Sequence, residues 1–117
     1  MRAVDEQTQE HAEAVLCPRF HRAVELIGRR WTGAIVRVLL GGPRRFNELL
    51  SAIPGISDRL LTERLRELEH EELIVRRVEA GSPVKVIYEL TPSGKELKGP
   101  LDALGAWAER WLGLPCD

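Results

Sequence analysis

The turn Ile53-Pro54-Gly55-Ile56 constrains the fold most strongly, because it separates two segments with helical patterns. The segment before it, from about Arg45 to Ala52, predicts a short helix with apolar residues on one face. The segment after it runs from Ser57 to about Glu72, with Ser57 as a favourable N-cap and leucines at i, i+4 and i+7: Leu61, Leu65 and Leu68. Two helices joined by a short turn with glycine predict a helix-turn-helix.

The pattern changes to that of β-strands directly after the second helix. The segments Ile74–Glu79 and Val84–Leu90 are rich in β-branched residues. The four residues between them, Ala80-Gly81-Ser82-Pro83, favour a turn. We therefore expect a two-stranded hairpin, which in this position would be the wing of a winged helix-turn-helix.

Three further helices are expected outside this unit. One begins at Pro18 and ends near Ile27, and the next runs from about Trp31 to Leu40, before the helix breaker Gly41-Gly42-Pro43. A last helix begins after the N-cap Thr91, and Gly99-Pro100 should kink or split it. The fold class is thus mainly α with a small β-hairpin, in one domain: an arm or short helix at 1–16, a core at 17–90 with its wing at 74–90, and helical residues at 91–117.

Several classes of protein are disfavoured by the composition. The 117 residues contain no apolar run long enough to span a bilayer and no signal-peptide pattern, so we expect a cytoplasmic protein. Cys17 and Cys116 lie too far apart to suggest a zinc motif, and His11, His21 and His70 have no nucleophile or carboxylate at a catalytic spacing. We expect no enzymatic activity, no metal and no cofactor.

Positive charge is concentrated in the middle of the chain, although the net charge is -1. From Gly28 to Tyr88 there are 11 Lys and Arg residues against 8 Asp and Glu residues, whereas both flanking segments are acidic. Only the docking surface of a nucleic-acid-binding protein has to be positive. This distribution is therefore compatible with double-stranded DNA as a partner.

The polar face of the helix that begins at Ser57 is the expected DNA-reading surface. The N-terminal part of such a helix enters the major groove, where an arginine can contact a guanine edge with two hydrogen bonds. Arg59 is the first candidate, and Glu63 could either accept from a cytosine amino group or orient Arg59. The remaining candidates on this helix are Ser57, Asp58, Thr62 and Arg66. The alternative is a solvated face with i,i+4 ion pairs, whereas for Arg64, beside the apolar stripe, we expect a structural salt bridge with a glutamate.

Other basic residues are expected to contact phosphates and to set affinity rather than sequence preference. Arg44 and Arg45 would open the helix before the turn, and Arg76, Arg77 and Lys85 lie on the hairpin. Because side chains alternate along a strand, at most one of Arg76 and Arg77 should face the DNA backbone.

The chain resembles the HxlR family of bacterial regulators, a branch of the MarR-like winged helices, from about Cys17 to Trp107. The similarity lies in CPRF, IGRRWTGAIVRVLL, GPRRFNELLSAIPGISDRLLTERLRELE and PVKVIYELTPSG. The chain differs at Arg29, where the family usually has a second glycine. The resemblance implies a transcriptional regulator that forms a homodimer through its N- and C-terminal helices. A winged helix that binds another protein and not DNA is the alternative.

Two further features suggest a response to a signal. Cys17 precedes Pro18 at a helix N-terminus, where the helix dipole favours a thiolate, and the resemblance implies that some relatives sense oxidants or electrophiles through a cysteine there. An inert Cys17 is the alternative, and a disulfide with Cys116 of the other subunit is a geometric option. Aromatic and apolar residues could form a dimer interface or line a pocket for a small-molecule effector: Phe20, Trp31, Leu101, Leu104, Trp107 and Trp111.

Overall fold

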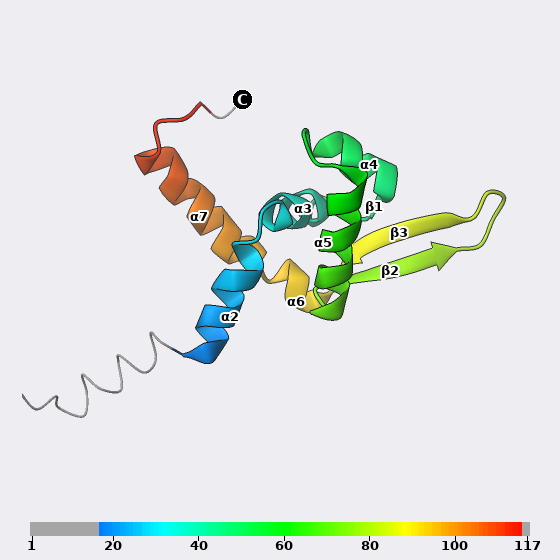
Figure 1. Ribbon diagram of the computed structural model, residues 1–117, viewed down its shortest axis with the longest axis horizontal. Coiled ribbons are helices and arrows are strands. Elements are labelled where there is room, and N and C mark those ends of the chain that lie inside the picture. Colours follow the sequence, from blue (N-terminus) through cyan, green and yellow to red (C-terminus); the bar gives the residue numbers. More distant parts are fainter. Residues whose placement is uncertain (1–16, 116–117) are drawn as a thin grey trace, which may run out of the picture.

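The computed structural model describes residues 17–115. The predicted arm at 1–16 and Cys116 lie outside the described residues. Along the chain, the elements are α2 (Pro18–Ile27), α3 (Thr32–Leu40), β1 (Arg44–Arg45), α4 (Phe46–Ala52), α5 (Asp58–His70), β2 (Ile74–Glu79), β3 (Lys85–Leu90), α6 (Pro92–Lys95) and α7 (Lys98–Trp111). In Figure 1, α3, α4 and α5 form the centre, the β2–β3 hairpin extends to one side, and α2 and α7 lie on the other.

The core lies between α3, α4, α5 and the inner end of the sheet. Ile35, Val36, Leu49, Leu61 and Leu68 are almost completely inaccessible to solvent. The leucine repeat of α5 therefore faces inward, as the sequence predicts, and its burial orients the opposite face of the helix toward solvent. No described helix is long and apolar enough to cross a membrane.

The sheet is antiparallel with the strand order β1-β3-β2. The hairpin pairs Ile74 with Leu90 at its base and Glu79 with Lys85 near its tip. The short strand β1 pairs Arg44 with Tyr88 on the outer edge of β3. Arg45 is the N-cap of α4, so this helix begins where the sequence predicts. The sequence did not predict that Arg44 and Arg45 also form a strand, because β3, their partner strand, is distant in sequence.

Two helix ends use residues other than glycine in the left-handed region. Trp31 has φ 79 and precedes α3, and Glu72 has φ 60 and follows α5. The backbone N–H of Leu73 donates to the carbonyl of Leu68, and that of Glu72 donates to Glu69. These two bonds form a Schellman motif that ends α5 and directs the chain into β2.

The C-terminal helix is split, but not where we expected. The break falls between α6 and α7, before Gly99-Pro100. Pro100 lies in the first turn of α7, where its missing N–H costs no helical hydrogen bond. Gly94 in α6 packs so closely on the backbone of Leu73 that a Cβ there would overlap the Leu73 carbonyl oxygen.

Candidate nucleic-acid interface and reactive thiol

The N-terminus of α5 is fixed by the cap that the sequence predicts. Ser57 has an extended backbone, and its Oγ accepts a hydrogen bond of 3.1 Å from the backbone N–H of Leu60. The Thr62 hydroxyl donates to the carbonyl of Asp58 at 2.8 Å. These bonds hold the first turn of α5 in place and occupy the hydroxyls of two of the candidate residues, Ser57 and Thr62.

Arg59 is a highly exposed candidate at the start of α5. Its side chain is 89% exposed, and its Nε lies 3.3 Å from Oε1 of Glu63. An exposed i,i+4 pair of this kind contributes only about 0.3–0.5 kcal/mol. Glu63 thus orients Arg59 in the free protein through a contact that a phosphate or a guanine edge could replace at little cost.

Arg66 lies toward the other end of the candidate surface. It is exposed, and it borders a hollow between α5 and α2 together with Arg22, Arg29 and His70. The predicted DNA-reading face of α5 therefore has two different surroundings. Arg59, at the N-terminus of α5, lies far from α2, whereas Arg66 lies beside α2.

Arg64 has the structural role that its position predicts. The residue is only 9% exposed, its Nε donates to the carbonyl of Arg30 at 2.9 Å, and its Nη1 pairs with Glu67 at 3.1 Å. Burial of a guanidinium requires such partners. The predicted salt bridge with a glutamate is confirmed.

The hairpin presents its two arginines on opposite faces. Arg76 is paired in register with Tyr88 and Arg77 with Ile87, so the two side chains alternate as expected. Arg77 is held by Glu89 at 3.0 Å and lies 3.8 Å from Glu79. Within the part of the chain that the structure describes, Arg76 and Lys85 have no ion-pair partner and are exposed.

The other two basic candidates lie at the start of α4. Arg44 donates from Nη1 to the carbonyl of Pro43, and Glu48 accepts a 2.8 Å hydrogen bond from the backbone N–H of Arg45. The Arg45 guanidinium is 3.9 Å from Glu48, so its charge is only weakly neutralised. Strand β1 thus places these two arginines beside the hairpin.

Cys17 occupies the N-cap position of α2, as expected, and is partly exposed. The backbone N–H groups of Arg19 and Phe20, at the start of α2, lower the pKa of its thiol below the ordinary value. A lowered pKa increases the thiolate fraction near neutral pH, and the thiolate is the reactive form. The position is therefore chemically suited to oxidation or to addition of an electrophile.

The candidate interface residues separate into two groups. Phe20 on α2 and Leu104, Trp107 and Trp111 on α7 are exposed, with Trp111 at 68%. Leu101 and Trp31 instead pack against the core. Trp31 contacts the helix-turn-helix turn at Gly55, and the Arg30 guanidinium lies 4.8 Å from its ring centre.

A groove runs between α3 and α7 beside the exposed group. It is lined mainly by apolar and small residues, among them Leu101, Leu104 and Ala108. Arg37 lies at its rim, 3.6 Å from Asp102, whose pKa is lowered mainly by a hydrogen bond from Lys98. Among residues 17–115, no cluster of His, Cys, Asp and Glu could hold a metal ion.

The fold and the exposed face of α5 define a winged helix-turn-helix protein. The model of the HxlR-like helix-turn-helix family matches residues 26–114. The chain belongs to this family, and it is a transcriptional regulator of the HxlR type. The resemblance noted in the sequence is thereby confirmed.

Several relatives are similar over most of their length. The transcriptional regulator YodB of Bacillus subtilis is 45% identical over 96 residues, which are 82% of this chain and 86% of YodB. The structure of reduced YodB superposes with a TM-score of 0.78 at 44% identity, covering 86% of this chain and 98% of that one. The oxidized form of the redox regulator HypR gives 0.76 at 34% identity, covering 84% and 100%. Structures of diamide-treated and quinone-bound YodB are also similar, with TM-scores of 0.72 and 0.73.

Proposed function

We propose that this regulator binds a near-palindromic operator as a homodimer and reads it with the N-terminal half of α5. The observation that carries this proposal is the exposed Arg59, oriented by Glu63 at the start of a helix whose other face is buried. Arg76 and Lys85 on the hairpin, with Arg44 and Arg45 beside it, supply positive charge for the flanking phosphates. In such dimers the two half-sites lie about one helical turn, roughly 34–36 Å, apart.

An electrophoretic shift with DNA from upstream of the protein's own gene tests this proposal. Arg59→Ala should lose preference for the operator by about 1–3 kcal/mol, which is the contribution of one bidentate contact, and should keep weak non-specific binding. Lys95→Ala, on α6, is the matched control and should bind like the wild type. Unchanged sequence preference in Arg59→Ala would show that α5 does not read the operator in this way.

The competing function is a winged helix that binds a protein partner. Absence of any DNA binding at low salt, where phosphate contacts are strongest, would favour it. The basic surface shared by β1 and the hairpin argues for DNA.

We further propose that Cys17 senses oxidants or electrophiles. The lowered pKa of Cys17 supports this, and so do the similar structures of YodB after diamide treatment and with a bound quinone. A quinone would form a thioether when the thiolate adds to a ring carbon. Diamide would take two electrons and two protons from Cys17 and a second thiol, and the two sulfurs would form a disulfide.

The test compares DNA release by wild type, Cys17→Ser and Cys116→Ser after treatment with diamide or a quinone. Cys17→Ser should remain bound to DNA with either reagent. Cys116→Ser should still respond to the quinone, and its response to diamide shows whether Cys116 of the partner subunit is the second thiol. Release of Cys17→Ser with the same dose dependence as wild type would exclude Cys17 as the sensor.

A further inference from the structure

Apolar contacts hold helix α2 to the core at one end only. None of its residues is buried, and only Leu26 and Ile27, at its C-terminal end, pack partly against the core. Apolar burial therefore fixes only one end of α2. Within one subunit, other contacts have to determine where its remaining turns lie.

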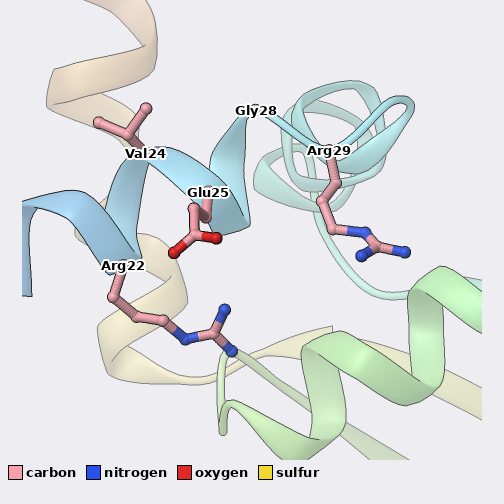
Figure 2. Close-up of a pocket in the computed structure, with 5 residues that line it drawn as sticks. All are labelled: Arg22, Val24, Glu25, Gly28 and Arg29. Atoms are coloured by element: carbon pink, nitrogen blue, oxygen red, sulfur yellow. The ribbon is translucent and has the colours of Figure 1, made fainter.

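These contacts are charged side chains that reach from α2 to α5. Arg22, in the second turn of α2, pairs with Glu71, which caps the C-terminus of α5. Arg29, directly after α2, pairs with Glu67 at 2.9 Å. Figure 2 shows both arginines extending from α2 and its following loop toward α5.

The two glutamates are well placed to transmit the position of α2. Glu67 also pairs with the buried Arg64, and the Nε of Arg64 donates to the carbonyl of Arg30. The Glu67 carboxylate therefore binds the loop at 29–30 both directly, through Arg29, and indirectly, through Arg64. Glu71 directly precedes Glu72, the left-handed residue that ends α5 and starts the wing. The Glu71 and Glu67 side chains are only 26% and 34% exposed, which strengthens the pairs relative to fully exposed ones.

We propose that Arg22 and Arg29 are positioning residues for the DNA-reading helix. They link α2, which begins at Cys17, to α5 and the base of the wing, so that modification of Cys17 reaches the DNA-reading surface through the pairs Arg22–Glu71 and Arg29–Glu67. This inference rests on the proposed function of α5 and Cys17. The sequence did not predict this linking role for any of the four residues; the one local sign at α2 was Arg29 in place of the usual glycine.

Charge reversal with rescue tests the link. In the reduced protein, Arg22→Glu and Glu71→Arg should each weaken operator binding at least fivefold, which is the lower end of the typical energetic coupling between two sites. The double variant should recover most of the lost affinity. Glu25→Arg is the matched control, because Glu25 pairs within α2 with His21 and not with α5. It should bind DNA within twofold of the wild type.

A readout without DNA separates this inference from the proposed function. Hydrogen exchange at 67–73 is measured in the Cys116→Ser background before and after Cys17 reacts with N-ethylmaleimide. Exchange should rise on reaction in the wild type, be high already in Arg22→Glu, and respond again in the double variant. The inference would be overturned by equal exchange in the unreacted wild type, the reacted wild type and Arg22→Glu, or by a double variant that behaves like the single ones. If the wild type binds no operator, the proposed function is refuted. The hydrogen-exchange result still shows whether the pairs Arg22–Glu71 and Arg29–Glu67 couple α2 to α5.

Discussion

The Nε of Arg64 donates to the carbonyl oxygen of Arg30 at 2.9 Å and so joins α5 to the loop before α3. Arg64→Met would keep most of the side-chain volume but leave this shielded carbonyl without its partner. We expect the free energy of unfolding to fall by about 1–3 kcal/mol. Urea unfolding measures the change, and Arg66→Met, on the exposed face of α5, is the control and should remain within about 0.5 kcal/mol of the wild type.

Glu72 should be a position where glycine stabilises the protein. Its φ of 60 lies in the left-handed region, which costs an L-residue about 1–2 kcal/mol. Glycine avoids this cost but loses more entropy on folding, so the net gain for Glu72→Gly should be about 0.5–1 kcal/mol in thermal or urea unfolding. Glu69→Gly, inside α5, should instead destabilise by about 1 kcal/mol. A loss of stability in Glu72→Gly would contradict the assigned Schellman motif.

The two arginines of β2 should differ in their effect on DNA affinity. Arg77 is already held by Glu89 and Glu79, whereas Arg76 has no ion-pair partner among residues 17–115. Arg76→Ala should reduce the slope of log Kobs against log salt by about 0.9, as expected for one phosphate contact, and Arg77→Ala should change it less. Titrations at several salt concentrations measure both slopes. Equal reductions would show that both side chains reach the DNA.

Exposed tryptophans on α7 should anchor the proposed homodimer. Trp107 and Trp111 are 53% and 68% exposed, and large aromatic residues dominate the energy of interfaces. Trp107→Ser should weaken the dimer by about 2 kcal/mol or more, measured by sedimentation equilibrium. Glu109→Ala, on the same helix, is the control. An unchanged dissociation constant for Trp107→Ser would place the interface elsewhere.

Alkylation of Cys17 should be pH-dependent in a way that reports its environment. Because N–H groups at the start of α2 lower the pKa of Cys17, the thiolate persists to lower pH in the folded protein than in the unfolded chain. Between the two pKa values the unfolded state binds more protons, so the thiol makes stability rise with pH in that window. Iodoacetamide labelling of Cys116→Ser, native and in urea, should give a lower midpoint for the native protein. If the labelling midpoints of the native and the unfolded protein coincide, the fold does not lower the pKa of Cys17.

The local features of the fold could be predicted from the sequence because their causes lie within a few residues. The Ser57 cap, the leucine face of α5 and the alternation in the hairpin all follow from nearest neighbours. Strand β1 could not be predicted, since Arg44-Arg45 has no strand pattern and depends on Tyr88 and Ile87 in β3. The end of α5 was placed too late because Glu72 adopts a conformation usually reserved for glycine or asparagine.

The candidate site was predictable to a similar extent. The exposure of Arg59 and the burial of Arg64 follow from their angles around α5. The pairing of Arg77 with Glu89, and of Arg29 with Glu67, depends on strand register and on how α2 lies across α5. Neither relation has a local signature, so the sequence could not distinguish Arg76 from Arg77 or indicate a role for Arg22.

The close packing of Gly94 on Leu73 has a genetic consequence. Every missense codon at position 94 would introduce a Cβ where the Leu73 carbonyl lies, at the junction of α5, β2 and α6. A random mutant library selected for loss of regulation should therefore yield alleles at this codon, although it encodes neither a DNA contact nor a thiol. In the proposed homodimer, such alleles would be recessive wherever the altered subunits fail to fold and so cannot pair with wild-type subunits.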